Sequence, residues 1–126
     1  MNTAHYTLNL VAGWYGFLGG VLSGMIIGLF FHREDWLGGY DSFPRRMIRL
    51  GHIAFFGLGL INILFALSAS GPSPWADAAS KLLIVGLVTM PVNCFATAWK
   101  RSFRHLFFIP AGSTGLGVVA LVLTLS

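Results

Sequence analysis

The side chains of this sequence best suited to chemistry at neutral pH are its four histidines, His5, His32, His52 and His105. Neutral imidazole binds haem iron and other transition metals, and its proton exchanges near pH 7. His52 stands inside an apolar run, one helical turn after Arg49, whereas His32 and His105 stand at the ends of such runs. This placement predicts a histidine-centred site near one boundary of the apolar region, with His5 on the far side.

A b-type haem is one cofactor that would suit these residues. His52 would supply one axial ligand, and His105 or His32 would supply the second from a neighbouring helix. The guanidinium groups of Arg49 and Arg104 would pair with the propionates, because forked donors match carboxylates. Arg101 is a further candidate for the propionates.

A quinone pocket would use the same region differently, with His52 donating to a quinone carbonyl between the rings of Phe55 and Phe56. A structural interpretation is also open, because histidines and arginines at a membrane interface contact lipid headgroups without any reaction. The sequence has no H-x-x-x-H or C-x-x-C pair, nucleophile elbow or phosphate-binding loop. We therefore expect no metal site built from protein ligands alone and no catalysis by the isolated chain.

Composition places these residues in a membrane protein. The chain has 126 residues, of which 56% are apolar and 10% are charged, whereas soluble domains average about 25% charged residues. A soluble domain of this length could not hide so much apolar surface. The net charge of +4 does not indicate a nucleic-acid partner, because the basic residues flank apolar runs and form no stripe along a helix.

Four apolar runs are long enough to cross a bilayer as helices, since a span needs roughly 20 residues. They cover about residues 8–31, 48–69, 81–99 and 103–125. The connections between them are short, so that consecutive helices must lie antiparallel. The sequence predicts an all-α integral membrane protein, a single transmembrane domain over 1–126 folded as a four-helix up-down bundle.

Local signals define two of the helix starts. Ser42 is followed two residues later by Pro44, and Ser73 is followed directly by Pro74. Serine is a preferred N-cap, and proline is tolerated in the first helical turn because its missing N–H would be unpaired there. We therefore expect the second helix to begin near Pro44, before it enters the lipid, and to end at the Ser70-Gly71-Pro72 turn.

Polar residues inside the spans are few. Asn62 and Asn93 are amides in apolar surroundings and should find hydrogen-bond partners within the protein. Asp77 and Lys81 stand four residues apart, a spacing that predicts a solvated ion pair on the helix surface. The spans lack carboxylates, which argues against an ion-driven transporter.

Seven of the eight basic residues fall in the first and third connections or in the adjoining helix starts, and Lys81 falls on the other side. The positive-inside rule then places both termini on the non-cytoplasmic face. We expect the protein to lie in a bacterial inner (plasma) membrane. Anionic lipids would bind at Arg45, Arg46, Arg49, Arg101 and Arg104.

Glycines recur every four residues in the first span, at Gly16, Gly20, Gly24 and Gly28. This spacing leaves a shallow groove on one helix face, where a second helix can approach closely. The sequence leaves open whether that second helix belongs to this chain or to another protein.

Three functions are compatible with these features. The first is an accessory or structural subunit of a larger membrane complex, of the respiratory or other electron-transfer kind, that meets other membrane subunits through its helices. The alternative is a small redox protein that binds haem b or quinone through His52. The third is a homo-oligomeric transporter or channel, which the scarcity of polar residues in the spans makes the weakest of the three.

Overall fold

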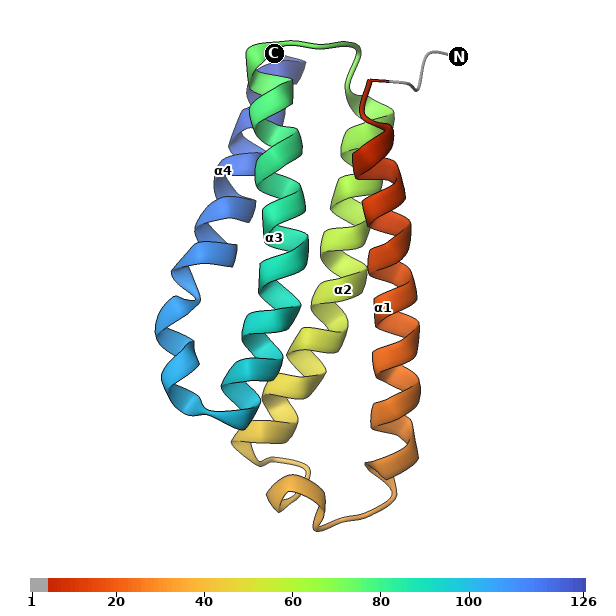
Figure 1. Cartoon of the computed structure of the whole chain (residues 1–126), viewed down its shortest axis with the longest axis vertical. Helices are drawn as coiled ribbons and strands as arrows, with labels where there is room; N and C mark the ends of the chain where they lie inside the picture. The colour runs from red at the N-terminus through yellow and green to blue at the C-terminus, as the bar shows by residue number, and fades with distance from the viewer. Residues whose placement is uncertain (1–4) are drawn as a thin grey trace.

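The computed structural model describes residues 5–126 and consists of four long helices that run alternately up and down (Figure 1). They are α1 (Thr7–Phe31), α2 (Phe43–Ser68), α3 (Pro74–Trp99) and α4 (Phe108–Leu125), with short 3₁₀ segments η1 (Trp36–Gly38) and η2 (Arg101–Leu106) in two connections. Each of α1, α2 and α3, and η2 together with α4, is long and apolar enough to cross a membrane. The chain is thus an all-α up-down bundle with four candidate transmembrane helices, as predicted.

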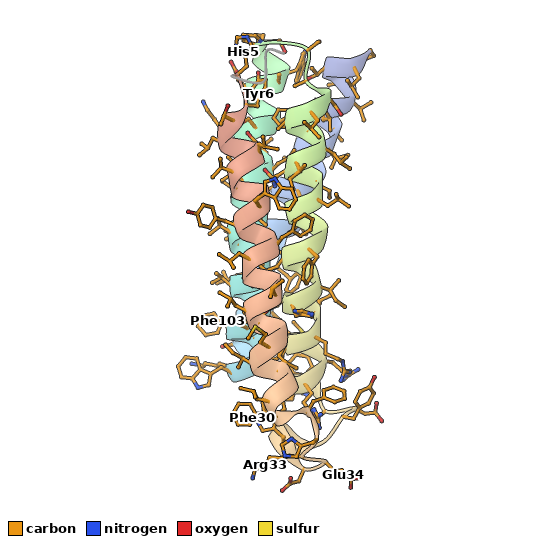
Figure 2. All side chains as sticks on the ribbon, turned by 90° about the vertical axis from the view of Figure 1, so that its right-hand side faces the viewer. His5, Tyr6, Phe30, Arg33, Glu34 and Phe103 are labelled. Atoms are coloured by element: carbon orange, nitrogen blue, oxygen red, sulfur yellow. The ribbon has the colours of Figure 1, made fainter. Side chains whose placement is uncertain are left out.

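Both ends of the described chain lie at one end of the bundle, and the two connections rich in arginine lie at the other (Figure 1). Figure 2 shows the same division at the level of side chains, with His5 and Tyr6 at one end and Arg33 and Glu34 at the opposite end. We call these the terminal end and the basic end of the bundle.

The predicted serine caps start α2 and α3. Ser42 Oγ accepts a hydrogen bond from the Arg45 N–H at 3.3 Å, and Ser73 Oγ accepts one from the Ala76 N–H at 3.1 Å. A proline follows in the first turn of each helix. Local chemistry alone therefore determines where these helices begin, several residues before the apolar runs that were expected to cross the lipid.

The start of α4 differs from the expected helix over 103–125. Residues Arg101–Leu106 form the 3₁₀ segment η2, and α-helical geometry begins at Phe108. Pro110 explains the break, because it has no N–H to donate to the Leu106 carbonyl one turn earlier. The first regular bond of the new helix runs from the Ala111 N–H to the Phe107 carbonyl, at 3.1 Å.

The helices pack in a row in chain order. The main contacts join α1 to α2, α2 to α3, and α3 to α4, with a smaller contact between α1 and α3. The ribbon in Figure 1 shows the same order across the molecule. Near the terminal end, a compact apolar cluster joins residues of α2, α3 and α4 to the residue before α1: Tyr6, Phe65, Ala76, Ala79, Leu83 and Ala120.

The glycine groove of α1 is filled by α2 of the same chain. A Cβ added at Gly13 would lie 2.6 Å from the Gly59 carbonyl oxygen, and one added at Gly16 would lie 3.0 Å from the Phe55 carbonyl oxygen. Backbone therefore meets backbone along this half of the interface. This close approach supplies the van der Waals contact that holds helices together in lipid.

Farther along the same interface, the glycines accommodate rings. A Cβ at Gly20 would lie 2.5 Å from the Phe56 ring, and one at Gly24 would lie 2.6 Å from the His52 ring. Gly28 has nothing within 4 Å of such an atom. The groove thus ends before Gly28, although the spacing of four continues to that residue.

Candidate functional site

His52 lies in the interface between α2 and α1, with its ring turned toward α1. Its Nδ1 is 3.0 Å from the Ser23 Oγ, and its ring meets Phe56 edge-on at 5.4 Å between centroids. The Ser23 hydroxyl also donates to the Gly20 carbonyl at 3.1 Å. Ser23 thus connects the His52 ring to the backbone of α1, and the tautomer of the ring determines which of His52 Nδ1 and Ser23 Oγ is the donor.

The structure does not bring the other two histidines of the predicted site to His52. His32 follows the last residue of α1 and is exposed, and His105 is exposed within η2, which packs against α3. The residues that surround His52 are instead Ser23 and Gly24 of α1 and Phe56 of its own helix. Across residues 5–126, no group of three or more His, Cys, Asp or Glu side chains could hold a metal ion.

Arg45 has the most enclosed charged side chain of the basic end, with 4% of its surface exposed. Its guanidinium donates to the carbonyl oxygens of Phe31, Arg33 and Glu34, each at 3.4 Å. These carbonyls belong to the end of α1 and the residues after it, where helical carbonyls lack partners. Arg45 therefore caps α1 from the start of α2.

Aromatic rings complete the enclosure of Arg45. Its guanidinium carbon lies 5.2 Å from the Phe31 ring, 5.5 Å from the Trp36 ring and 6.0 Å from the Tyr40 ring. These distances fall in the range of cation–π attraction. The donors of Arg45 thus point to carbonyls and rings of the protein, whereas the sequence suggested a lipid headgroup as its partner.

The other arginines of the basic end are more open. Arg49 donates to the Tyr40 carbonyl at 2.9 Å and stacks on its ring at 4.2 Å, and Arg101 lies 4.2 Å over the Phe43 ring. Arg46 and Arg104 are exposed. Of the expected partners of haem propionates, Arg49 is on α2, whereas Arg101 and Arg104 are on η2.

A buried polar network joins three helices near the terminal end. Asn9 Nδ2 donates to Asn62 Oδ1 at 2.8 Å and to the Ser80 carbonyl at 3.1 Å, and the Ser80 hydroxyl donates back to Asn9 Oδ1. Asn62 Nδ2 in turn donates to the carbonyls of Leu58, at 2.9 Å, and Leu83, at 3.1 Å. Both amides are fully buried, and the predicted internal partner of Asn62 is confirmed.

Sequence reasoning missed Asn9 in this role. The residue stands in the first turn of α1, where an asparagine is ordinarily read as part of a polar terminus. The available signal was the apolar character of the residues on both sides of it. The predicted internal partner of Asn93 is also confirmed, because its Nδ2 donates to the Phe103 carbonyl of η2 at 3.1 Å.

The expected pair between Asp77 and Lys81 does not form. Asp77 Oδ1 accepts a hydrogen bond from the Tyr6 hydroxyl at 2.9 Å, which ties the residue before α1 to the first turn of α3. Burial, and then the hydrogen bond and negative charge of Asp77, raise the pKa of the Tyr6 phenol above its ordinary value. The i, i+4 spacing was compatible with the ion pair, but a tertiary partner displaced it.

Two apolar grooves flank the exposed side of α3. The α1–α3 groove has a volume of about 460 Å³; Tyr15 and Val11 form one wall, Val88 and Val92 the other, and Gly16 lies between. The α3–η2 groove is smaller, about 260 Å³, and lies between α3 and the start of the fourth span. None of the residues that line these two grooves is charged or a histidine.

A third, shallower hollow on α1 adjoins the α1–α3 groove and is lined by Val11, Trp14, Tyr15 and Leu18. Trp14 and Tyr15 are 60% and 68% exposed. Neither the indole N–H of Trp14 nor the hydroxyl of Tyr15 has a hydrogen-bond partner among residues 5–126.

Comparison of the chain with protein-family models, with curated proteins and with solved structures finds no match.

Proposed function

We propose that this protein is a small accessory subunit of a larger membrane complex and that it meets a helix of a neighbouring subunit along α1. The observation that carries the proposal is the pair of unpartnered donors, the Trp14 indole N–H and the Tyr15 hydroxyl, beside the α1–α3 groove. Short connections add no soluble domain to the described chain, so that its helix surfaces are its main means of contact.

The depth of these donors supports a protein partner. Tyr15 is six residues beyond Asn9, or about 9 Å farther along the helix axis. Asn9 is bonded to Ser80, the neighbour of Lys81, which is the charged residue nearest to this level of the bundle. Trp14 and Tyr15 therefore extend into the hydrocarbon, below the headgroup level that their ring types favour, where an unpaired polar group costs several kcal/mol.

The groove beside Tyr15 has a form suited to a helix. Ala12, a small residue of its lining, permits a close approach, and its walls are apolar residues of α1 and α3. A transmembrane helix lying there would present a hydroxyl, amide or free carbonyl oxygen as acceptor to Tyr15. Interhelical hydrogen bonds of this kind are worth about 0.6–2 kcal/mol in membranes.

Gentle extraction of the tagged chain from its native membrane in copolymer nanodiscs tests the proposal. We expect a distinct membrane protein to co-purify at a fixed stoichiometry, measured by quantitative mass spectrometry. Tyr15→Phe and Trp14→Phe keep the rings and remove the donors, and together they should lower the recovered partner about fivefold or more. Trp75→Phe, which changes an exposed tryptophan of α3 outside this region, should leave the recovery unchanged.

Other outcomes would favour the other functions. A stable monomer without a stoichiometric companion would contradict the proposal, and a discrete homo-oligomer that conducts ions or solutes in vesicles would indicate a transporter or channel. A Soret band that disappears in His52→Ala would instead establish the haem-binding alternative. The identity of the co-purified subunits would reveal whether the complex carries out electron transfer.

A further inference from the structure

The segment η2 has two chemically different edges. It is a 3₁₀ helix, in which residues three apart lie on the same side, about 6 Å apart along the axis. Phe103 and Leu106 share one side and line the α3–η2 groove. Arg101 and Arg104 share another side, where both are exposed.

We propose that this segment binds one anionic phospholipid, with an acyl chain in the α3–η2 groove and the headgroup phosphate between Arg101 and Arg104. Val88 and Val92 line both this groove and the α1–α3 groove, but η2 and its two arginines take no part in the proposed subunit contact and lie in the half of the bundle nearer the basic end. Figure 2 shows Phe103 toward that end, on the level of the lower part of α1.

The groove fits an acyl chain. Its volume of about 260 Å³ is below the roughly 300–1,000 Å³ of pockets for drug-sized ligands, and its lining is almost entirely apolar, with Val92, Ala96 and Ile109 beside the two η2 residues. Lipid chains are the solvent on this surface. A concave apolar groove of this kind can hold one acyl chain in a fixed position, where a flat surface would contact several mobile acyl chains.

The groove is held open by a buried amide. Asn93 is 7% exposed and donates to the Phe103 carbonyl of η2 at 3.1 Å, while the Thr97 hydroxyl donates to Asn93 Oδ1 at 3.4 Å. These bonds attach η2 to α3 at one point. Pro110 then sets the direction of α4 beyond the break in helical hydrogen bonding. The hollow lies between the Asn93–Phe103 bond and Pro110.

The charges on the neighbouring side of η2 favour an anion. Within the described chain, Lys100, Arg101 and Arg104 form no ion pair with an acidic side chain, and Arg101 is oriented by the Phe43 ring at 4.2 Å. The acidic residues of the same end, Glu34, Asp35 and Asp41, are exposed in the first connection. Two arginines whose backbone positions are about 6 Å apart along η2 can both extend their guanidiniums to the oxygens of one phosphodiester.

Native mass spectrometry of the full chain, delipidated and then exposed to phosphatidylglycerol or phosphatidylcholine with identical acyl chains, tests the site. We expect one phosphatidylglycerol to be retained at least fivefold more than phosphatidylcholine. Arg101→Gln and Arg104→Gln should each reduce this preference about fivefold. Arg33→Gln, which removes an exposed arginine from the same end of the bundle, is the matched control and should change it less than twofold.

The apolar half of the site has its own test. Ala96→Phe places a ring in the groove and should lower the retention of both lipids, and Ile109→Ala, which disturbs packing little because Ile109 is 42% exposed, should lower it less. Helicity by circular dichroism checks the fold of each variant. Retention unaffected by Ala96→Phe would mean a headgroup contact without a chain site and would overturn the proposal.

Two further measurements separate other occupants from the lipid. Displacement of phosphatidylglycerol by millimolar inorganic phosphate would show that the arginines bind phosphate without the lipid, contrary to the proposal. A photoreactive residue at position 106 should crosslink to lipid in native membranes. Crosslinking there to a transmembrane protein would assign the groove to a partner helix and overturn the lipid site.

Discussion

The imidazole ring of His52 lies directly over Gly24, so closely that a Cβ on Gly24 would be 2.6 Å from His52 Cε1. The same ring is bonded to Ser23, the residue before Gly24. Glycine at position 24 is therefore a condition for the orientation of the histidine. A methyl group at this position would displace the ring and break its hydrogen bond to Ser23.

The first prediction concerns the glycines of α1. Gly13→Ala should destabilise the protein by about 1–3 kcal/mol, because the new methyl would meet the Gly59 carbonyl, which cannot move without its helix. Gly28→Ala has open space and should be neutral or stabilising by up to about 1 kcal/mol. Unfolding by steric trapping in bicelles measures both values; equal effects at the two positions would contradict the described interface.

The second prediction concerns the buried amide network. Asn9→Ala and Asn62→Ala should each destabilise the bundle, and a double-mutant cycle should give a coupling of about 0.6–1.7 kcal/mol for their hydrogen bond. Thr124→Ala is the control, since the Thr124 hydroxyl donates to the Ala120 carbonyl of its own helix. It should show no coupling with Asn62→Ala, and additive effects of the two asparagines would refute the network.

The third prediction concerns Arg45. Arg45→Gln should destabilise the end of α1 by about 2 kcal/mol, because the replacement reaches fewer of the three carbonyls and loses the cation–π contacts. Hydrogen exchange should accelerate in residues 29–36 and remain slow in α3. Arg46→Gln removes a neighbouring exposed arginine and should leave the exchange rates as they are; acceleration by both variants would point to a general effect of charge.

The fourth prediction concerns pH. The folded state raises the pKa of Tyr6 above 10.0, so that the unfolded chain loses this proton first as the pH rises. Stability from this group is complete below about pH 10 and is lost as the pH passes through the folded-state pKa. Tyr6→Phe keeps the ring against Phe65 and should weaken the alkaline decline in thermal stability, whereas Tyr40→Phe should not.

The fifth prediction concerns orientation. In a Cys94→Ala background, a cysteine at Ser126 should react with impermeant maleimide from the non-cytoplasmic side of the membrane, and one at Ser102 should react only after the membrane is opened. This result follows from the excess of basic residues at the end that carries η2. Labelling of both positions in intact cells would contradict the arrangement of the bundle across the membrane.

The parts of the fold that sequence reasoning predicted are those with local causes. Ser42 and Ser73 cap helices through hydrogen bonds to N–H groups three residues away. The four spans were predicted because residues that face lipid must be apolar. The partner of the α1 glycines could not be deduced, because it depends on which helix lies beside α1. The same limit hid Asn9 and the Tyr6–Asp77 bond, whose partners are 53 to 71 residues away in sequence.

The candidate site was predicted less completely for a related reason. Depth along the bundle follows from sequence position: His32 follows the last residue of α1 and His105 is in η2, both at the basic end, and His52 lies farther in, beside Ser23. Direction around a helix axis does not follow, and the ring of His52 faces Ser23 and Gly24 while His105 is carried by η2 on α3. Arg45 was read as a surface charge because nothing local signals that three carbonyls of α1 require its donors.

The row of helices in chain order has a consequence for biogenesis. α2 packs extensively on α1, α3 on α2 and α4 on α3, so a newly inserted span can dock on the helix made just before it without waiting for a distant one. The bonds from Asn9 and Tyr6 to α3 then close the first three spans into one unit, and α4 is added last, against α3 alone among its major contacts. A nascent chain arrested after α3 should therefore already resist protease.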